Sequence, residues 1–113
     1  MRCDVQALAG RCVARYGSDA AVLCPLAGAL ATRLDSPYHA QALLTLALTL
    51  AKRELPSLRG ANVMADGSLS GLLPDTPSVM LVKVVAHALR LCVTRFGEDE
   101  TGRLVAEAWP ELR

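Results

Sequence analysis

The two histidines are the first residues to examine for chemistry, because imidazole can act as a general base or as a metal ligand. His39 falls in the first turn of an expected helix, and His87 falls on the polar side of another. Neither has a second ligand at position i+3 or i+4, which is the spacing that brings two ligands together on one helix face. We therefore expect both imidazoles to be solvated or locally hydrogen-bonded, and we predict no metal site.

The cysteines do not form a metal or redox motif. They are Cys3, Cys12, Cys24 and Cys92. They show neither a C-x-x-C pair nor zinc-ligand spacing, so in a reducing compartment we expect free thiols without an intrachain disulfide. Cys12 and Cys92 lie on apolar helix faces, where cysteine behaves as a small hydrophobic residue. Cys92 follows His87 by five positions, about 140° around a helix, so a thiol–imidazole pair would need two helices, such as His39 with Cys12.

The remaining polar motifs do not match a known catalytic pattern. The segment from Gly67 to Gly71 lacks both the spacing and the lysine of a phosphate-binding loop. Asp66 precedes Gly67 without the further carboxylates of a calcium loop. Asp35, Asp66 and Asp75 are expected in turns, where aspartate is common. We predict that the protein is not an enzyme and has no cofactor.

The longest helical pattern, at residues 37–55, defines the centre of the expected fold. Ser36 can cap its N-terminus and Pro37 suits the first helical position. Its polar residues fall within a sector of roughly 120°, and alanine and leucine fill nearly all the rest. They are Gln41, Thr45, Thr49, Lys52 and Arg53. The uncharged run 40–51 is shorter than the roughly 20 residues of a membrane span, so we expect a central helix of a bundle.

A second enclosed helix is predicted at residues 77–96, which is far too long for a strand. Its polar stripe is only about 60° wide and consists of Lys83, His87, Arg90 and Thr94. We expect the two central helices to pack side by side and to make six residues almost inaccessible. These are Leu44, Ala47, Leu50, Val85, Leu89 and Cys92.

Three outer helices complete the expected architecture, at residues 4–16, 19–34 and 99–109. Pro25 interrupts the second of these, so a kink or a late start is expected there. The long connection 56–77 contains several glycines and prolines but also apolar side chains that can dock. We expect it to be structured, either as a hairpin with Asp66-Gly67 as a two-residue turn or as two short helical turns. The predicted fold class is an all-α bundle of about five helices, forming a single domain over residues 1–113.

Composition points to a binding function. Hydrophobic residues make up 52% of the chain. Glycine adds about 7%, and the sum of the two exceeds the roughly 45–50% that average domains reach when counted in this way. We predict that the apolar surplus forms a protein-binding surface, most simply for self-association as a homodimer. The residues expected to carry it are Met64, Leu69, Leu72, Leu73 and Trp109. The competing interpretation is that the connection folds back and buries these residues as a lid on the bundle.

Charge and the N-terminus set further expectations. The net charge of +1 gives no polybasic footprint, so nucleic acid is an unlikely partner. Asp4 and Gln6 interrupt any signal-peptide core, and no membrane span is expected. We predict a cytoplasmic protein.

Two alternative functions remain open. The first is a small winged-helix DNA-binding regulator, with helix 37–55 as reader and the Asp66-Gly67 hairpin as wing. Gln41, Thr45 and Thr49 would then face the bases, although recognition helices usually present Arg, Lys, Asn or Gln. This alternative therefore ranks below protein binding.

The second alternative depends on residues 89–99. Leu89, Val93 and Phe96, followed by Gly97-Glu98-Asp99, resemble the amphipathic death-motif helix of Bcl-2 family ligands. Glu98 stands where that motif usually has aspartate, and Glu100 stands where it has an apolar residue. The resemblance implies a Bcl-2-like helical bundle that binds a partner helix.

Overall fold

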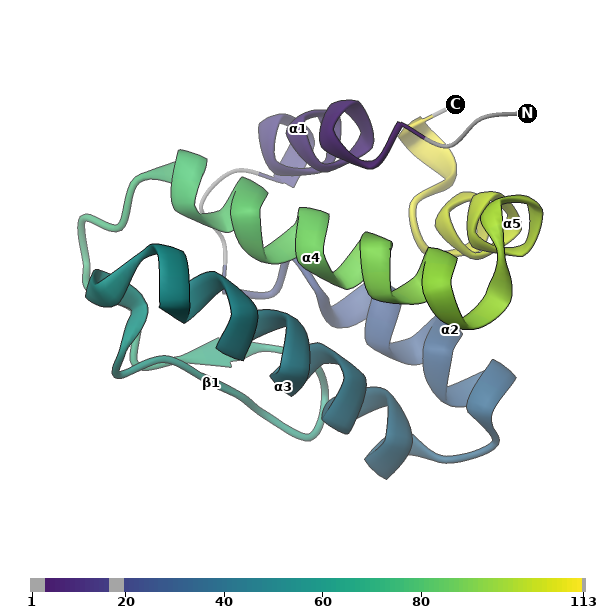
Figure 1. Cartoon of the computed structure of the whole chain (residues 1–113), viewed down its shortest axis with the longest axis horizontal. Coiled ribbons are helices and arrows are strands. Elements are labelled where there is room, and N and C mark those ends of the chain that lie inside the picture. The colour runs from purple at the N-terminus through teal and green to yellow at the C-terminus, as the bar shows by residue number, and fades with distance from the viewer. Residues whose placement is uncertain (1–3, 17–19, 113) are drawn as a thin grey trace.

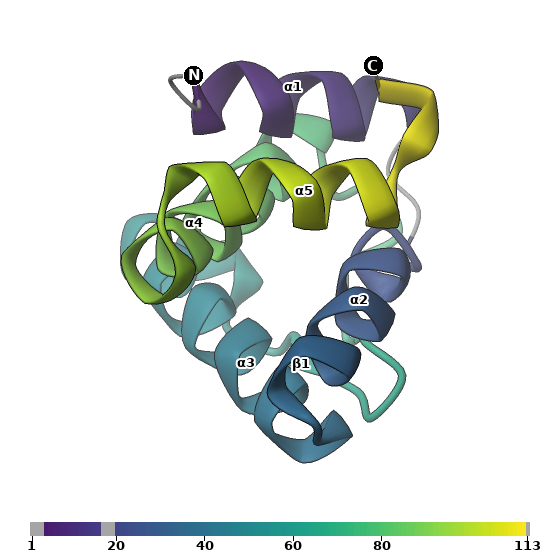
Figure 2. The same cartoon turned by 90° about the vertical axis from the view of Figure 1, so that its right-hand side faces the viewer.

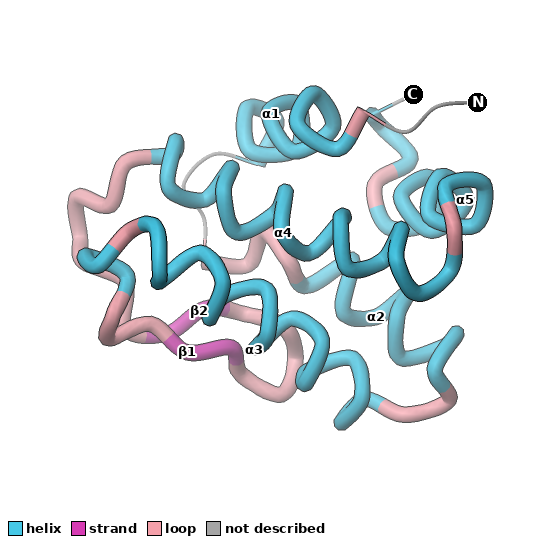
Figure 3. The backbone as a smooth tube through the Cα atoms, viewed as in Figure 1, coloured by secondary structure: helices cyan, strands magenta, loops and turns pink. Residues whose placement is uncertain are grey.

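The computed structural model describes residues 4–16 and 20–112 and consists almost entirely of helices (Figures 1 and 3). The α-helices are α1 (Val5–Tyr16), α2 (Cys24–Leu34), α3 (Pro37–Glu54), α4 (Ser78–Phe96) and α5 (Glu98–Ala108). A short hairpin, β1 (Asn62–Val63) and β2 (Leu69–Ser70), and two 3₁₀ turns, η1 (Pro56–Leu58) and η2 (Pro110–Leu112), complete the described elements. The predicted all-α bundle of five helices is confirmed.

Helix α4 lies at the centre of the bundle. It packs against α1, α3 and α5, and Figure 1 shows it running between α1 and α3. Seven of its residues are buried: Leu81, Val84, Val85, Ala86, Ala88, Leu89 and Cys92. The exposed and half-buried side chains on its other side include the predicted polar stripe. The sequence-based expectation of a narrow polar stripe on an enclosed helix is therefore confirmed for α4.

Helix α3 is less enclosed than the sequence predicted. Its buried residues, Ala40, Leu44, Ala47, Leu48 and Ala51, lie on one side only. Leu50 was expected to be inaccessible but is half-buried, and Leu46 is 49% exposed. The reason is the arrangement of neighbours: α3 packs against α2, α4 and the hairpin segment, whereas α1 and α5 pack on α4 and not on α3. Figure 2, turned by 90°, shows α1 and α5 together at one end of the bundle and α3 at the other.

The helix boundaries follow local chemistry. The Ser36 hydroxyl accepts a hydrogen bond from the His39 backbone N–H at 3.2 Å, and Pro37 begins α3 as predicted. Helix α2 was expected from residue 19, which lies outside the described residues, but it begins at Cys24 with Pro25 in its first turn. Proline lacks the backbone N–H that a helix beginning earlier would need at this position, so α2 starts late instead of being kinked.

The connection between α3 and α4 contains both expected kinds of structure, a 3₁₀ turn and a hairpin. The strands pair Asn62 with Ser70 and Val63 with Leu69. The hairpin turn is longer than predicted, because the backbone N–H of Met64 bonds to the carbonyl of Ser68 across the three residues 65–67. Gly67 has φ +90°, as the last position of such a loop requires.

The hairpin is fixed to the helices rather than projecting from them. The Leu69 N–H donates to the Ala20 carbonyl at 2.8 Å, and the Gln41 side chain donates to the Val63 carbonyl at 3.0 Å. A Cβ at Gly67 would lie 2.5 Å from the Cβ of Ala27, so the turn packs directly on α2. The hairpin therefore covers one side of α2 and α3.

None of the described helices combines the length and apolar character that crossing a bilayer would require.

Candidate functional site

The structure divides the predicted binding residues between core and surface. Leu69 and Trp109 are buried, the latter only 1% exposed, and Leu72 is half-buried. Met64 and Leu73 are exposed, by 46% and 55%. These five residues therefore do not form one accessible apolar surface, which corrects the expectation that the surplus emerges there.

The burial of Leu69 and Trp109 has two structural causes. Docking of the hairpin on the helices turns Leu69 inward. After α5 the chain turns into η2, which packs against both α1 and α5. An ion pair between Arg15 and Glu111, 2.7 Å from Nη2 to Oε2, ties η2 to the end of α1. A binding role for Met64, Leu72 and Leu73 stays a prediction.

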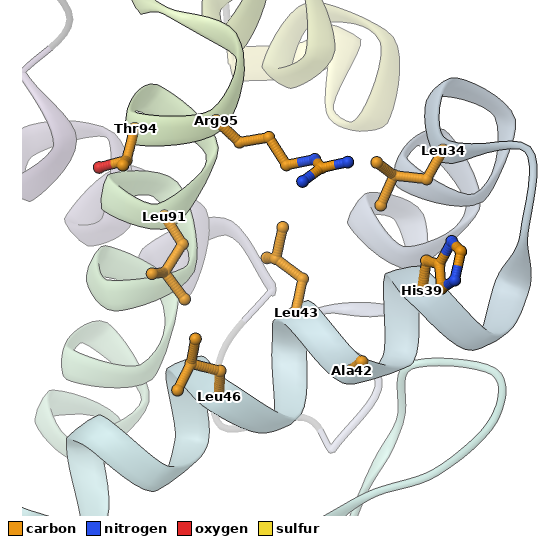
Figure 4. Close-up of a pocket in the computed structure, with 8 residues that line it drawn as sticks. All are labelled: Leu34, His39, Ala42, Leu43, Leu46, Leu91, Thr94 and Arg95. Atoms are coloured by element: carbon orange, nitrogen blue, oxygen red, sulfur yellow. The ribbon is translucent and has the colours of Figure 1, made fainter.

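An apolar groove that the sequence interpretation missed lies between α3 and α4, next to the end of α2. It has a cavity volume of about 520 Å³. Figure 4 shows its lining residues: Leu34, His39, Ala42, Leu43, Leu46, Leu91, Thr94 and Arg95. This groove is the candidate functional site.

The open side of α3 supplies half of the residues that line the groove. His39, Ala42 and Leu46 follow each other at spacings of three and four, so they lie along one line of the helix. Leu43 lies one position beyond Ala42 and points into the space between the two helices (Figure 4). A signal for this line was present in the sequence, since ionisable His39 and Arg53 lie on the same side as Ala42 and Leu46 and need solvent.

Helix α4 supplies the opposite wall. Leu91 faces the groove opposite Leu46, and the Arg95 side chain reaches across the open end toward Leu34 (Figure 4). The Thr94 hydroxyl donates to the Arg90 carbonyl at 3.1 Å, so its hydrogen-bonding capacity is partly used within α4. The groove thus has leucine walls and one cationic end.

The ionisable side chains of the groove are basic. Arg95 and His39 are its only ionisable lining residues, and the lining contains no carboxylate. Within residues 4–16 and 20–112, no carboxylate forms an ion pair with Arg95, whose guanidinium carbon lies 5.9 Å from the centroid of the Phe96 ring. Arg95 is therefore available to an anionic group from outside the described chain.

Arg33, near the same end of α2, is in the opposite state. Its Nε lies 2.8 Å from Glu100 Oε1, and its Nη1 contacts Glu107, so it links α2 to α5. Hydrogen bonds hold the pKa of Glu100 below its usual value; the bond from Arg33 has the larger effect and the bond from Arg103 the smaller. Arg33 is a structural ion-pair residue, whereas Arg95 is not.

The other end of the α3–α4 surface carries one acidic group that is already paired. The His87 Nε2 lies 2.8 Å from Glu54 Oε2. This hydrogen bond is the main reason why the pKa of Glu54 lies below its usual value, with Lys83 contributing by charge. His87, which was expected to be solvated or locally hydrogen-bonded, instead bonds to a residue of another helix, 33 positions away.

The thiols lie away from the groove. Cys12 and Cys92 are buried as predicted, and no disulfide joins two cysteines of the described residues; Cys3 lies outside the described residues. Burial raises the pKa of the Cys12 thiol to about 12, so it stays protonated at neutral pH. The Cys12 thiol is therefore not an activated nucleophile. In the described residues, no three His, Cys, Asp or Glu side chains cluster as a metal site would require.

The structure also places the residues of the two alternative functions. Gln41, the amide of the proposed DNA reader, is bonded to the hairpin that would serve as its wing. Of the death-motif residues, Leu89 is fully buried in α4, and neither Val93 nor Phe96 lines the groove. Thr45 and Thr49, the other two residues of the proposed reader, are exposed on α3.

Fold and site together define an all-α bundle with an apolar groove between its two longest helices. No protein-family model matches the chain, and no curated protein or solved structure is significantly similar to it.

Proposed function

We propose that the protein is a non-catalytic binding module that holds a segment of another polypeptide chain in the α3–α4 groove. The observation that supports this most strongly is the exposure of Leu46, at 49%, beside Leu43 and Leu91. Apolar surface of this kind, rimmed by polar residues, is typical of interaction sites.

The dimensions of the groove favour a helical segment as ligand. From His39 to Leu46 the α3 wall extends over two turns, or about 10 Å at the rise of an α-helix. A helix that docks in an apolar groove inserts side chains at positions i, i+3 or i+4, and i+7. Three such anchors would match the length of the leucine-lined part.

The thiols and the remaining exposed residues bear on the setting of this function. The lack of a disulfide between the described cysteines Cys12, Cys24 and Cys92 supports a cytoplasmic, reducing environment. Self-association as a homodimer is a second form of the same function, supported by the exposure of Met64 and Leu73 on the connection.

Site-specific photocrosslinking tests the proposed function. A photoreactive phenylalanine analogue at position 46 should form a covalent adduct with a polypeptide in the native host, because this position lines the groove. The matched control places the analogue at Val79, which is 65% exposed on the same bundle but does not line the groove.

The adduct at position 46 should disappear when Leu91→Glu is introduced, since a carboxylate on the opposite wall opposes apolar docking. Circular dichroism melting confirms that each variant is folded. Equal adducts from positions 46 and 79, or an adduct that survives Leu91→Glu, would contradict the proposal, and so would the lack of any adduct at position 46.

A further inference from the structure

We infer that the groove binds an amphipathic helix of a different protein, which places an acidic side chain against Arg95. This inference rests on the proposed function and adds the chemistry of the partner. The evidence is the charge of the groove and of the surface around it.

Arg95 is the residue that an acidic side chain would meet. Its guanidinium spans the open end of the groove toward Leu34 (Figure 4), and it has no carboxylate partner among the described residues. The planar fork of arginine matches both oxygens of a carboxylate. Arg33 shows arginine–carboxylate pairing within this same protein, with one contact to Glu100 and one to Glu107.

The charged side chains on the two helices that form the walls of the groove are mostly basic. Beyond the groove, the exposed or half-buried ionisable residues of α3 and α4 include Arg53, Lys83 and Arg90. Glu54, the only carboxylate on either helix, is hydrogen-bonded to His87. An interface is favoured when the potentials of its two sides are complementary, so this face selects a partner with acidic groups.

The same argument disfavours a second copy of this chain. In a two-fold dimer the same surface is used by both subunits, so two faces rich in basic residues would meet. Like charges brought together at an interface oppose association. The groove is therefore suited to a partner of different sequence.

The geometry also fixes where the acidic residue belongs. Arg95 and His39 lie at one end of the groove, while Leu46 and Leu91 lie toward the other. A partner helix would place its three apolar anchors along the leucine walls and its glutamate or aspartate within one turn of the anchor nearest Arg95.

Two synthetic peptides of the same length test this inference on the full chain. Both carry leucines at positions i, i+4 and i+7, and they differ only in having two glutamates or two lysines in the turn beyond the last leucine. Fluorescence anisotropy of the labelled peptides measures their affinities. We expect the glutamate peptide to bind at least tenfold more tightly at low salt and to lose this advantage as salt is raised.

Arg95→Glu should reverse the preference, so that the lysine peptide binds more tightly. The matched control is Arg11→Glu, which changes an exposed arginine of α1 that does not line the groove and should leave the preference intact. Equal affinities for the two peptides, no binding of either, or an unchanged preference in Arg95→Glu would overturn the inference.

Other occupants give distinct results. A wild-type dimer in sedimentation equilibrium that Leu46→Glu converts to a folded monomer would identify a second copy as the occupant and overturn the inference. Tighter binding of dodecanoate than of the glutamate peptide would overturn it in favour of a small amphiphile. The proposed function itself fails separately, through the photocrosslinking result at position 46.

Discussion

Helices α3 and α4 are nearly equal in length, with 18 and 19 residues, but they have different environments. Helix α4 is covered by α1, α3 and α5 and is buried over most of its circumference. Helix α3 is covered on one side by α2, α4 and the hairpin, and its other side retains exposed Leu46 beside Leu43. The comparison teaches that an apolar sequence does not by itself identify a core helix, because the number of neighbouring elements decides how much of it is buried.

The difference assigns separate roles to the two helices. The leucines and valines of α4 are needed to hold the bundle together. Leu46 on the open side of α3 is 49% exposed, so we expect it to contribute less to folding than the buried leucines and to be available for binding. Each of the following experiments compares a residue in the enclosed environment with one in the open environment.

The largest expected effect is the protection of a thiol. Cys92 on α4 should react with a thiol reagent only when the protein unfolds, which slows labelling by a factor of about 10³ or more for a typical stable domain. A cysteine introduced as Leu46→Cys on α3 should react at a rate close to that of an unfolded chain. Mass spectrometry of quenched, digested samples follows each cysteine separately. Equal labelling rates at positions 92 and 46 would show that α4 is not the enclosed helix.

Truncation of a core leucine should have the next largest effect. Leu89→Ala on α4 and Leu44→Ala on the buried side of α3 should each lower the free energy of unfolding by about 2–5 kcal/mol, because each leaves a cavity. Leu46→Ala removes the same atoms from the open side of α3 and should change it by less than about 0.5 kcal/mol. Urea denaturation followed by circular dichroism measures the three values. A Leu46→Ala cost equal to that of Leu44→Ala would contradict the difference between the two sides of α3.

A substitution in the hairpin that packs against α3 should have a smaller effect on stability. Gly67→Ala should destabilise the protein by at least about 1–3 kcal/mol, the cost of a left-handed backbone at a residue other than glycine. The new Cβ would also collide with Ala27 on α2. Thermal melting and amide exchange at Leu69 should both report loosening of the hairpin.

Gly10→Ala is the matched control for this glycine change. Gly10 lies inside α1 with open space around the added Cβ, so the substitution should stabilise by about 0.5–1 kcal/mol. Similar melting temperatures for Gly67→Ala and the wild type would show that the hairpin does not depend on its contact with α2.

Much of the fold could be predicted because local signals agreed with the hydrophobic pattern. Ser36 and Pro37 mark the start of α3, Gly97 ends α4, and the narrow polar stripe of α4 correctly indicated burial. Pro25 predicted a kink or a late start within the expected helix 19–34, and the late start is what the structure shows. The hairpin was expected, but its loop length depends on backbone hydrogen bonds that the sequence alone does not determine.

The groove could not be predicted for a different reason. Counting polar residues correctly placed Thr45 and Thr49 on the exposed side of α3, but it did not indicate that the hairpin covers Gln41 or that the exposed surface extends to Leu46. Which side of an apolar helix stays open depends on where distant segments dock. Trp109 was misassigned to the surface for the same reason, because the packing of η2 against α1 is a tertiary contact.

The enclosed position of Trp109 gives the molecule a single optical reporter. It is the only tryptophan in the chain, and its indole N–H has no hydrogen-bond partner among the described residues. An indole held in apolar surroundings fluoresces at shorter wavelength than one in water, so the emission maximum should move to the red on unfolding. Because Trp109 does not line the groove, a ligand that docks between α3 and α4 should leave the wavelength of the emission maximum unchanged. Intrinsic fluorescence therefore measures whether the bundle is intact, independently of whether its groove is occupied.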